Sequence, residues 1–204
     1  MVISHWVVIN KKGLSRDNTL LKDGDNLSPG ELYNDLHCKY PKFFKMDKLC
    51  KWAWIAAEYL LSGNDLRYER IDKHKIALAL TTSQGCLDVD QRYYESIGMP
   101  SPSLFVYTLP NIMLGEISIR HGFKGEQVCL MREGFDAPEL HFITEGLVND
   151  NDMDACLCGW VNVADEGYDI CLLWITREGK GVNFTSAALQ ELYNYASYTS
   201  QGIN

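Results

Sequence analysis

The stretch from Gly125 to Val163 constrains the fold of this chain more than any other. Its sequence is GEQVCLMREGFDAPELHFITEGLVNDNDMDACLCGWVNV. An apolar run, Val128 to Met131, predicts a short strand, and a tight turn at residues 133–135, which we call the elbow, follows it. An amphipathic pattern then predicts a helix to about Val148, and the run Ala155 to Gly159 predicts a second, buried strand. Strand, turn, helix and strand form a βαβ unit, in which the strands are parallel and the helix crosses one face of the sheet. The sequence therefore predicts an α/β fold.

Composition favours one globular domain spanning residues 1–204. The chain has 204 residues, of which 46% are hydrophobic, enough to bury a core. A formal net charge of −8 argues against a nucleic-acid partner, which calls for a basic surface. No run of eighteen apolar residues predicts a membrane span, and the N-terminus MVISHWVVINKKG lacks the features of a signal peptide. The seven cysteines lie mostly in apolar contexts, which fits reduced thiols in the cytoplasm.

The first half of the chain carries three further predicted elements. Trp6 to Ile9 predicts a strand, and the polar stretch after it, reaching about Pro41, predicts a long loop that is either a surface excursion or an arm facing a partner. Asp47 is placed to cap a core helix that ends at Ser62, because apolar residues recur at helical spacing between them. The run Ile76 to Leu80 predicts a compact buried strand.

Other elements flank the βαβ unit. A turn at Gly85 precedes a predicted helix that carries Tyr93, Tyr94 and Ile97. The segment SPSLFVYTLPNIMLGEISIRHGFKG then leads to Gly125 through a helix containing Gly115. Beyond the unit, Tyr168 to Thr176 predicts a buried strand, and apolar spacing over residues 187–196 predicts a terminal helix.

Two intervals in the central stretch are similar to those of a β-ketoacyl synthase, a condensing enzyme of the thiolase-like superfamily. In that family a glycine opens the strand, the nucleophilic cysteine lies nine residues later at the elbow, and an aspartate lies twenty residues further on, before a buried strand that ends in glycine. Gly125, Gly134 and Asp154 reproduce both intervals, and Gly159 ends the strand. By this resemblance the position of the cysteine is occupied by Gly134.

The resemblance covers residues 40–176. Its most specific part is SPSLFVYTLPN, and KMDKLCKWAWIAAEYLL resembles the first ketosynthase helix. This is one of the two halves of the thiolase-like fold, and the half that supplies the family's catalytic histidines has no counterpart. The resemblance implies a truncated ketosynthase-like domain with α-β-α layers around a mainly parallel mixed sheet.

The elbow is expected to have no catalytic residue. A family cysteine is activated at the N-terminus of a helix, where unpaired N–H groups favour the thiolate, and a glycine at residue 134 cannot hold an acyl group. Asp136 and Glu139 predict a capping box that places carboxylates where the enzyme needs positive potential. The alternative use of the elbow is a pocket for an acyl chain, lined by Met131, Gly134 and Phe135.

A displaced nucleophile is the second alternative, and it would make the protein an acyltransferase or hydrolase acting on thioesters of an acyl carrier protein. The candidates are Cys129 and Ser83, which stands beside Gln84 and Gly85. Cys129 lies between Val128 and Leu130, an apolar context that raises the pKa of a thiol, so a core cysteine is favoured.

Neither a metal nor a cofactor is expected. Cys156 and Cys158 alternate on one predicted strand, and with Cys171 they lack the Cys-x-x-Cys spacing of zinc sites. The five histidines are scattered, and the chain contains neither a phosphate-binding glycine loop nor an HExxH motif.

A subunit interface is implied by the resemblance. In the family the segment matching Ser101 to Asn111 runs along the dimer interface, which points to Tyr107, Thr108, Pro110 and Asn111; the other interpretation is that these residues only shape a loop. Family members also dimerise through the strand before the elbow, which here contains Val128 and Leu130. A homodimer in isolation is expected, with an active ketosynthase subunit as the partner in the cell.

The expected function is that of a non-catalytic partner, comparable to a chain-length factor, in fatty-acid, polyketide or aryl-polyene biosynthesis. A third alternative is a module that binds an acyl carrier protein. Carrier proteins are acidic, and one basic cluster, formed by Lys42, Lys45, Lys48 and Lys51, would suit them. The competing interpretation of this cluster is a solvated helix edge.

Overall fold

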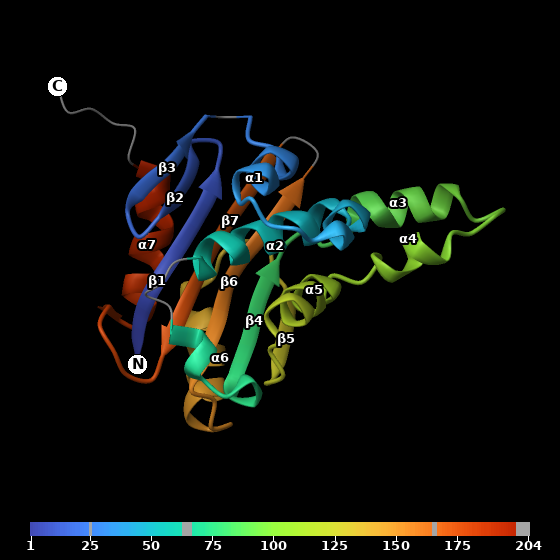
Figure 1. Ribbon diagram of the computed structural model, residues 1–204. Coiled ribbons are helices and arrows are strands. Elements are labelled where there is room, and N and C mark those ends of the chain that lie inside the picture. Colours follow the sequence, from blue (N-terminus) through green and yellow to red (C-terminus); the bar gives the residue numbers. More distant parts are fainter. Residues whose placement is uncertain (25, 63–66, 165–166, 199–204) are drawn as a thin grey trace.

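The protein forms one mixed β-sheet covered by helices on both faces, as seen in a computed structural model that describes residues 1–24, 26–62, 67–164 and 167–198 (Figure 1). The strand order is β3-β2-β1-β7-β6-β4-β5, and β8 also pairs with β1. The strands are β1 (Val2–Asn10), β2 (Gly13–Arg16), β3 (Thr19–Asp23), β4 (Ile76–Thr82), β5 (Gln127–Met131), β6 (Ala155–Ala164), β7 (Gly167–Thr176) and β8 (Val182–Asn183). The α-helices are α1 (Pro29–Asp35), α2 (Lys48–Leu61), α3 (Leu87–Glu95), α4 (Pro102–Val106), α5 (Ile112–His121), α6 (Ala137–Asn149) and α7 (Ser186–Tyr198), and the short 3₁₀ helices are η1 (Pro41–Lys45), η2 (Arg67–Arg70) and η3 (Lys73–Lys75).

Two hydrophobic cores, one on each face of the sheet, hold the layers together. Successive side chains of a strand point to opposite faces, so Leu78 of β4 packs in the core under α2 and α5, while Ala79 packs in the core under α6 and α7. Figure 1 views the sheet from the side of α2 and α5. The predicted α-β-α layering is confirmed.

The central βαβ unit is confirmed, with one strand inserted in it. β5 and β6 are parallel, but each pairs with β4, which lies between them; Leu78 is opposite Gln127 on one side and Leu157 on the other. Helix α6 therefore crosses over a strand that comes much earlier in the chain. The local pattern specifies the direction of both strands but not the partner that separates them.

The antiparallel share of the mixed sheet is larger than the sequence indicates. Parallel pairing is confined to β4 with its two neighbours, whereas β7 is antiparallel to both β6 and β1. A short connection joins β6 to β7, and the two strands pair as far as Ala164 opposite Gly167. A short connection of this kind favours an antiparallel hairpin.

The expectation of a long polar loop between Ile9 and Pro41 is wrong. This stretch contains the hairpin β2-β3, which extends the sheet beyond β1, and the helix α1. The hairpin turns at Asp17 and Asn18, whose φ angles of 48° and 64° place both in the left-handed region that such tight turns require. The strands are short and β3 is largely exposed, so they carry little of the apolar alternation that reveals a strand.

Most other predicted elements are confirmed with small changes at their ends. Asp47 caps α2 as predicted, because its carboxylate accepts hydrogen bonds from the amides of Leu49 (3.0 Å) and Cys50 (3.1 Å). The strand predicted to end at Leu80 continues to Thr82, and the one predicted to end at Gly159 continues to Ala164. Within the described ranges, every helix is too short or too polar to cross a bilayer.

Helices α3 and α4 project away from the sheet as an arm (Figure 1). We call residues 87–109 the α3–α4 arm. Its exposed large apolar side chains are Leu87, Tyr94, Ile97, Met99, Phe105, Val106 and Leu109. A monomeric protein seldom exposes so many large apolar groups on one projecting element.

Candidate functional site

The elbow connects the end of β5 to the start of α6 and is open to solvent. Gly134 is exposed, and a Cβ atom built on it would have no other heavy atom within 4 Å. Neither space nor a left-handed backbone therefore requires glycine here. The position has room for a cysteine, so packing does not account for the glycine at residue 134.

Two acidic residues lie at the N-terminus of α6. Asp136 Oδ1 accepts a hydrogen bond from the Glu139 amide at 2.9 Å, which is half of the predicted capping box. The Glu139 carboxylate turns instead to Arg132, whose guanidinium donates to it through Nε (2.5 Å) and Nη2 (2.6 Å). Asp136 thus already occupies one amide of the first turn, while the charge of Glu139 is offset by Arg132.

The structure separates the side chains that were expected to line a pocket at the elbow. Met131 lies toward Gly85, where its Cε is 3.2 Å from the position of a Cβ on that glycine. Phe135 lies on the opposite side of the elbow and stacks on Tyr193 of α7, with ring centroids 4.2 Å apart. Three cavities in the described part of the chain are lined by other residues, without Met131, Gly134 or Phe135.

Two glycines of the ketosynthase-like spacing are required by close packing. A Cβ on Gly125 would lie 2.3 Å from the carbonyl oxygen of Ile76, and one on Gly159 would lie 2.0 Å from that of Cys171. Gly159 also has a φ of 152°, which side chains disfavour. Asp154, the third member of the pattern, donates its amide to the Lys75 carbonyl at 2.8 Å. The spacing that survives in this chain is therefore the part that builds the sheet.

Neither alternative nucleophile has the surroundings of one. Burial raises the pKa of the Cys129 thiol to about 11, as the apolar context predicts. The amides of Ser83 and Gln84 donate to Asn162 Oδ1 at 3.3 and 3.2 Å, and in the described residues no hydrogen bond joins the Ser83 hydroxyl to a histidine. Both groups lack the adjacent base that activates a nucleophile.

The three strand cysteines lie in the core beneath α6 and α7. Cys156, Cys158 and Cys171 are fully buried there, and burial raises the pKa of Cys158 to about 12. Among the residues that the structure describes, no three His, Cys, Asp or Glu side chains converge as metal ligands would. The three cysteines therefore do not converge with other described ligand-type side chains.

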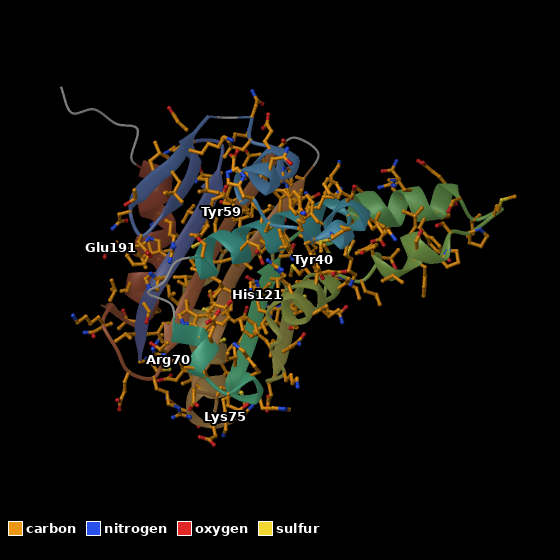
Figure 2. All side chains as sticks on the ribbon, in the orientation of Figure 1. Tyr40, Tyr59, Arg70, Lys75, His121 and Glu191 are labelled. Atoms are coloured by element: carbon orange, nitrogen blue, oxygen red, sulfur yellow. The ribbon has the colours of Figure 1, made fainter. Side chains whose placement is uncertain are left out.

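A buried charge cluster joins α2 to α5, and sequence reasoning missed it. The Glu58 carboxylate receives Arg120 Nε (2.8 Å) and Nη2 (2.9 Å), and His121 Nε2 lies 3.0 Å from it. The side chain of His121, labelled in Figure 2, is 7% exposed. Burial alone would raise the pKa of Glu58, but the bonds from His121 and Arg120 outweigh it and lower that pKa. The sequence signal for this cluster was Glu58 itself, an acidic residue on an otherwise apolar helix face.

A second buried carboxylate engages two residues that were assigned to other roles. Glu116 is 3% exposed, lies 2.8 Å from Lys42 Nζ, and accepts a hydrogen bond from the Tyr107 hydroxyl at 3.2 Å. Burial and this carboxylate raise the pKa of Tyr107. The hydroxyl of half-buried Tyr107 thus faces Glu116, and Lys42 is paired within the chain.

The remaining predicted interface and carrier residues have local contacts. Thr108 Oγ1 donates to the Phe105 carbonyl at 2.7 Å, and Pro110 and Asn111 form the entry to α5. Of the other lysines in the basic cluster, Lys48 lies 3.7 Å from Asp88. In the described residues, Lys45 and Lys51 have no carboxylate within ion-pair distance.

Comparison with known proteins identifies the fold. No protein-family model matches the sequence, and no curated protein is significantly similar to it. Solved structures do match. One is the ishigamide ketosynthase/chain length factor, with 15% identity and a TM-score of 0.59. Another is AntDE:AntF, a type II PKS acyl-carrier protein in complex with its ketosynthase, with 11% identity and a TM-score of 0.60. A third is the ketosynthase ApeO in complex with its chain length factor ApeC from Xenorhabdus doucetiae, with 13% identity and a TM-score of 0.59. The chain has a ketosynthase fold.

The matched structures differ in how much of their own length this chain covers. The alignments cover 86% of this chain and 62% of the matched chain for the first two structures, so the chain spans less than two thirds of those proteins. For the ApeO–ApeC complex they cover 96% of this chain and 91% of the matched chain. The ketosynthase fold therefore occurs in solved structures both in longer chains and in a chain of nearly this length.

Proposed function

We propose that this protein is a non-catalytic partner of an active ketosynthase, with a role like that of a chain length factor in fatty-acid, polyketide or aryl-polyene biosynthesis. We place it in the cytoplasm, as one ketosynthase-like domain. The observation that carries the proposal is a free sheet edge next to an exposed apolar arm, on a fold shared with ketosynthase–chain length factor complexes. An elbow without a nucleophile supports the same role.

The free edge belongs to β5, the last strand in the sheet order. Glu126 O accepts from the Leu78 amide, and the Arg132 amide donates to Thr82 O, both at 2.9 Å, so the even-numbered residues of this segment face β4. In a regular ladder the backbone groups of Gln127, Cys129 and Met131 then point away from the sheet. Such an edge is a ready template for a strand of another chain.

Apolar surface lies on both sides of this edge. In the α3–α4 arm, Met99 is 87% exposed and Tyr94 is 73% exposed. On the other side, a hollow of about 460 Å³ has an apolar part, which includes Val128 of β5 and Phe142 of α6, bordered by acidic and amide side chains. An apolar surface flanking an unpaired strand is the arrangement that a subunit interface would cover.

The size of the chain is compatible with this role. One chain of the ApeO–ApeC complex aligns with nearly all of this protein over 91% of its own length. A chain of this length therefore occurs in a complex of a ketosynthase with its chain length factor. We propose that this protein contributes the corresponding kind of subunit.

Affinity purification from the native host tests the partnership. We expect the tagged protein to recover a ketosynthase, identified by mass spectrometry, and Met99→Asp on the arm to reduce that recovery. Leu20→Asp, at another exposed apolar position, on β3 at the far edge of the sheet, is the control and should recover as much ketosynthase as the unaltered protein. Repeated recovery of the protein alone would contradict the proposal.

A homodimer through the same edge is proposed for the isolated protein. Met131→Pro removes one N–H from the free edge without breaking the ladder to β4, because proline is tolerated where its nitrogen faces solvent. We expect light scattering to show a dimer for the unaltered protein and a dissociation constant raised about tenfold in Met131→Pro. A monomer at micromolar concentration in the unaltered protein would remove this part of the proposal.

Two proposals about acyl chemistry accompany the partner role. Binding of an acyl carrier protein would use Lys45 and Lys51, since Lys42 and Lys48 already face carboxylates. No acyl transfer by the chain itself is expected, so intact mass spectrometry after incubation with an acylated carrier protein should show an unchanged mass. A covalent acyl adduct would instead support the acyltransferase or hydrolase alternative.

A further inference from the structure

A cavity of about 590 Å³ lies at one corner of the molecule, where α1, the N-terminal half of α2 and the joined ends of β6 and β7 meet (Figure 1). β4 separates this corner from β5, so the cavity belongs neither to the elbow nor to the proposed subunit edge. Its size is within the range of small-molecule sites. The described lining residues are aromatic, aliphatic, small or basic, and none of them is acidic.

Aromatic side chains form its floor. Trp52 of α2 stacks on Tyr168 of β7, with ring centroids 4.1 Å apart and an interplanar angle of 27°. The Leu27 amide donates to the Tyr168 hydroxyl at 3.0 Å, which ties the residues before α1 to the sheet and holds that wall in place. The floor is therefore flat, apolar and preformed.

Phe44 forms an exposed apolar wall. Its side chain is 64% exposed, although its ring contacts those of Tyr33 and Phe43 edge-on, with centroids 5.2 and 5.6 Å away. The remaining ring surface faces solvent at the mouth of the cavity. A planar ligand on the floor would cover it and gain the free energy of apolar burial.

Lysines supply the charge at the rim. Lys48 lies near Asp88, but Lys11 and Lys51 have no carboxylate within 4 Å in the described part of the chain. Lys51 Nζ lies 6.0 Å from the centre of the Phe43 ring. Lys11 lies along Gly167, with its Cε 3.3 Å from the position of a Cβ there. Asp165 and Glu166, which directly precede Gly167 in the sequence, are outside the described residues. In a chain of net charge −8, a lining without described acids and with two unpaired cations favours an anion.

We propose that this cavity binds a small amphipathic anion, with a planar apolar body between the Trp52–Tyr168 floor and Phe44 and a carboxylate or phosphate at Lys11 and Lys51. The aromatic floor selects the body, and the two cations select the charge. This binding is independent of the proposed subunit interface, because the elbow, β5 and the α3–α4 arm do not line the cavity, but it shares Lys51 with the proposed carrier-protein surface.

Calorimetric titration with three naphthalene probes tests the proposal. We expect 2-naphthoate or 2-naphthyl phosphate to bind at one site with a dissociation constant on the order of 1 mM or below, and the tighter of the two identifies the head group. The neutral 2-naphthalenemethanol should bind about tenfold more weakly. Absence of saturable binding by both anions, or equal affinity for the alcohol, would overturn the proposal.

Variants locate the site. Lys11→Gln with Lys51→Gln should weaken the anions about tenfold and leave the alcohol unchanged, whereas Phe44→Ser should weaken all three probes. Lys39→Gln with Lys45→Gln removes the same charge from exposed positions outside the cavity and is the matched control. An equal loss in the control pair would show that net charge, and not the cavity, attracts the probe, and it would overturn the assignment. Phe44→Ser decides the matter if the lysine pair fails to fold.

Discussion

Phe135 of the elbow stacks on Tyr193 of the C-terminal helix, with ring centroids 4.2 Å apart and an interplanar angle of 16°. The Tyr193 hydroxyl donates to Asp169 of β7, and the same carboxylate oxygen accepts Trp160 Nε1 at 3.0 Å. α7 is thereby anchored to the sheet and to the elbow together. One side of the elbow is thus covered by the chain itself.

A double-mutant cycle measures this contact. Phe135→Leu and Tyr193→Leu each remove the stacking, and we expect a coupling free energy of about 1 kcal/mol between them in denaturant unfolding. Tyr193→Phe keeps the ring and loses only the hydroxyl, so it should cost about 1 kcal/mol without abolishing the coupling to Phe135. Additive effects of the two leucine variants would show that the rings do not interact.

The ion pair of Lys42 with Glu116 gives a second prediction. Lys42→Met leaves a carboxylate that is 3% exposed without its cation, so we expect a loss of about 2–3 kcal/mol in the free energy of unfolding. Lys45→Met, at an exposed lysine of the same η1 helix, is the control and should change stability by less than about 0.5 kcal/mol. Equal effects of the two variants would place Lys42 in solvent.

The Glu58 cluster makes stability depend on pH in the acid range. Because the folded-state pKa of Glu58 is lowered below its ordinary value of 4.5, its contribution is complete above that value and is lost as the pH falls through the folded pKa. We expect the drop in unfolding free energy between pH 6 and about pH 3 to be smaller in Glu58→Gln than in the unaltered protein. Glu191→Gln, at an exposed carboxylate of α7 (Figure 2), should leave the drop unchanged. An identical drop in Glu58→Gln would show that the cluster does not hold this carboxylate ionised.

Cys129 is expected to react slowly with iodoacetamide. A pKa of about 11 leaves only about 0.03% of the thiol ionised at pH 7.5, and labelling should rise with pH as the thiolate forms. Gly134→Cys provides the positive control, because its new thiol is exposed and displaces nothing. Mass spectrometry should show rapid modification of residue 134 and slow modification of residue 129. Fast, selective labelling of Cys129 in the native protein would reopen its assignment as a nucleophile.

The sequence by itself determined the elements whose signals are local. Asp47 and the helical spacing after it predicted α2, because a cap and an apolar stripe depend on residues a few positions apart. The runs in β4 and β6 predicted buried strands and the run in β5 a short strand, and the resemblance over Gly125 to Gly159 predicted a ketosynthase fold that the solved structures confirm. The same local signals did not predict the β2-β3 hairpin, because both strands are short and β3 is exposed, so that they carry almost no periodic pattern.

Only the tertiary structure decided which distant residues meet. It inserted β4 between β5 and β6, brought Glu58 to His121 across more than sixty residues, turned the Tyr107 hydroxyl to Glu116, and sent Met131 and Phe135 to opposite sides of the elbow. It also assembled the anion cavity from α1, α2 and the β6-β7 hairpin. The physical reason is that burial and charge pairing act between side chains that are close in space, and no interval along the chain specifies that proximity.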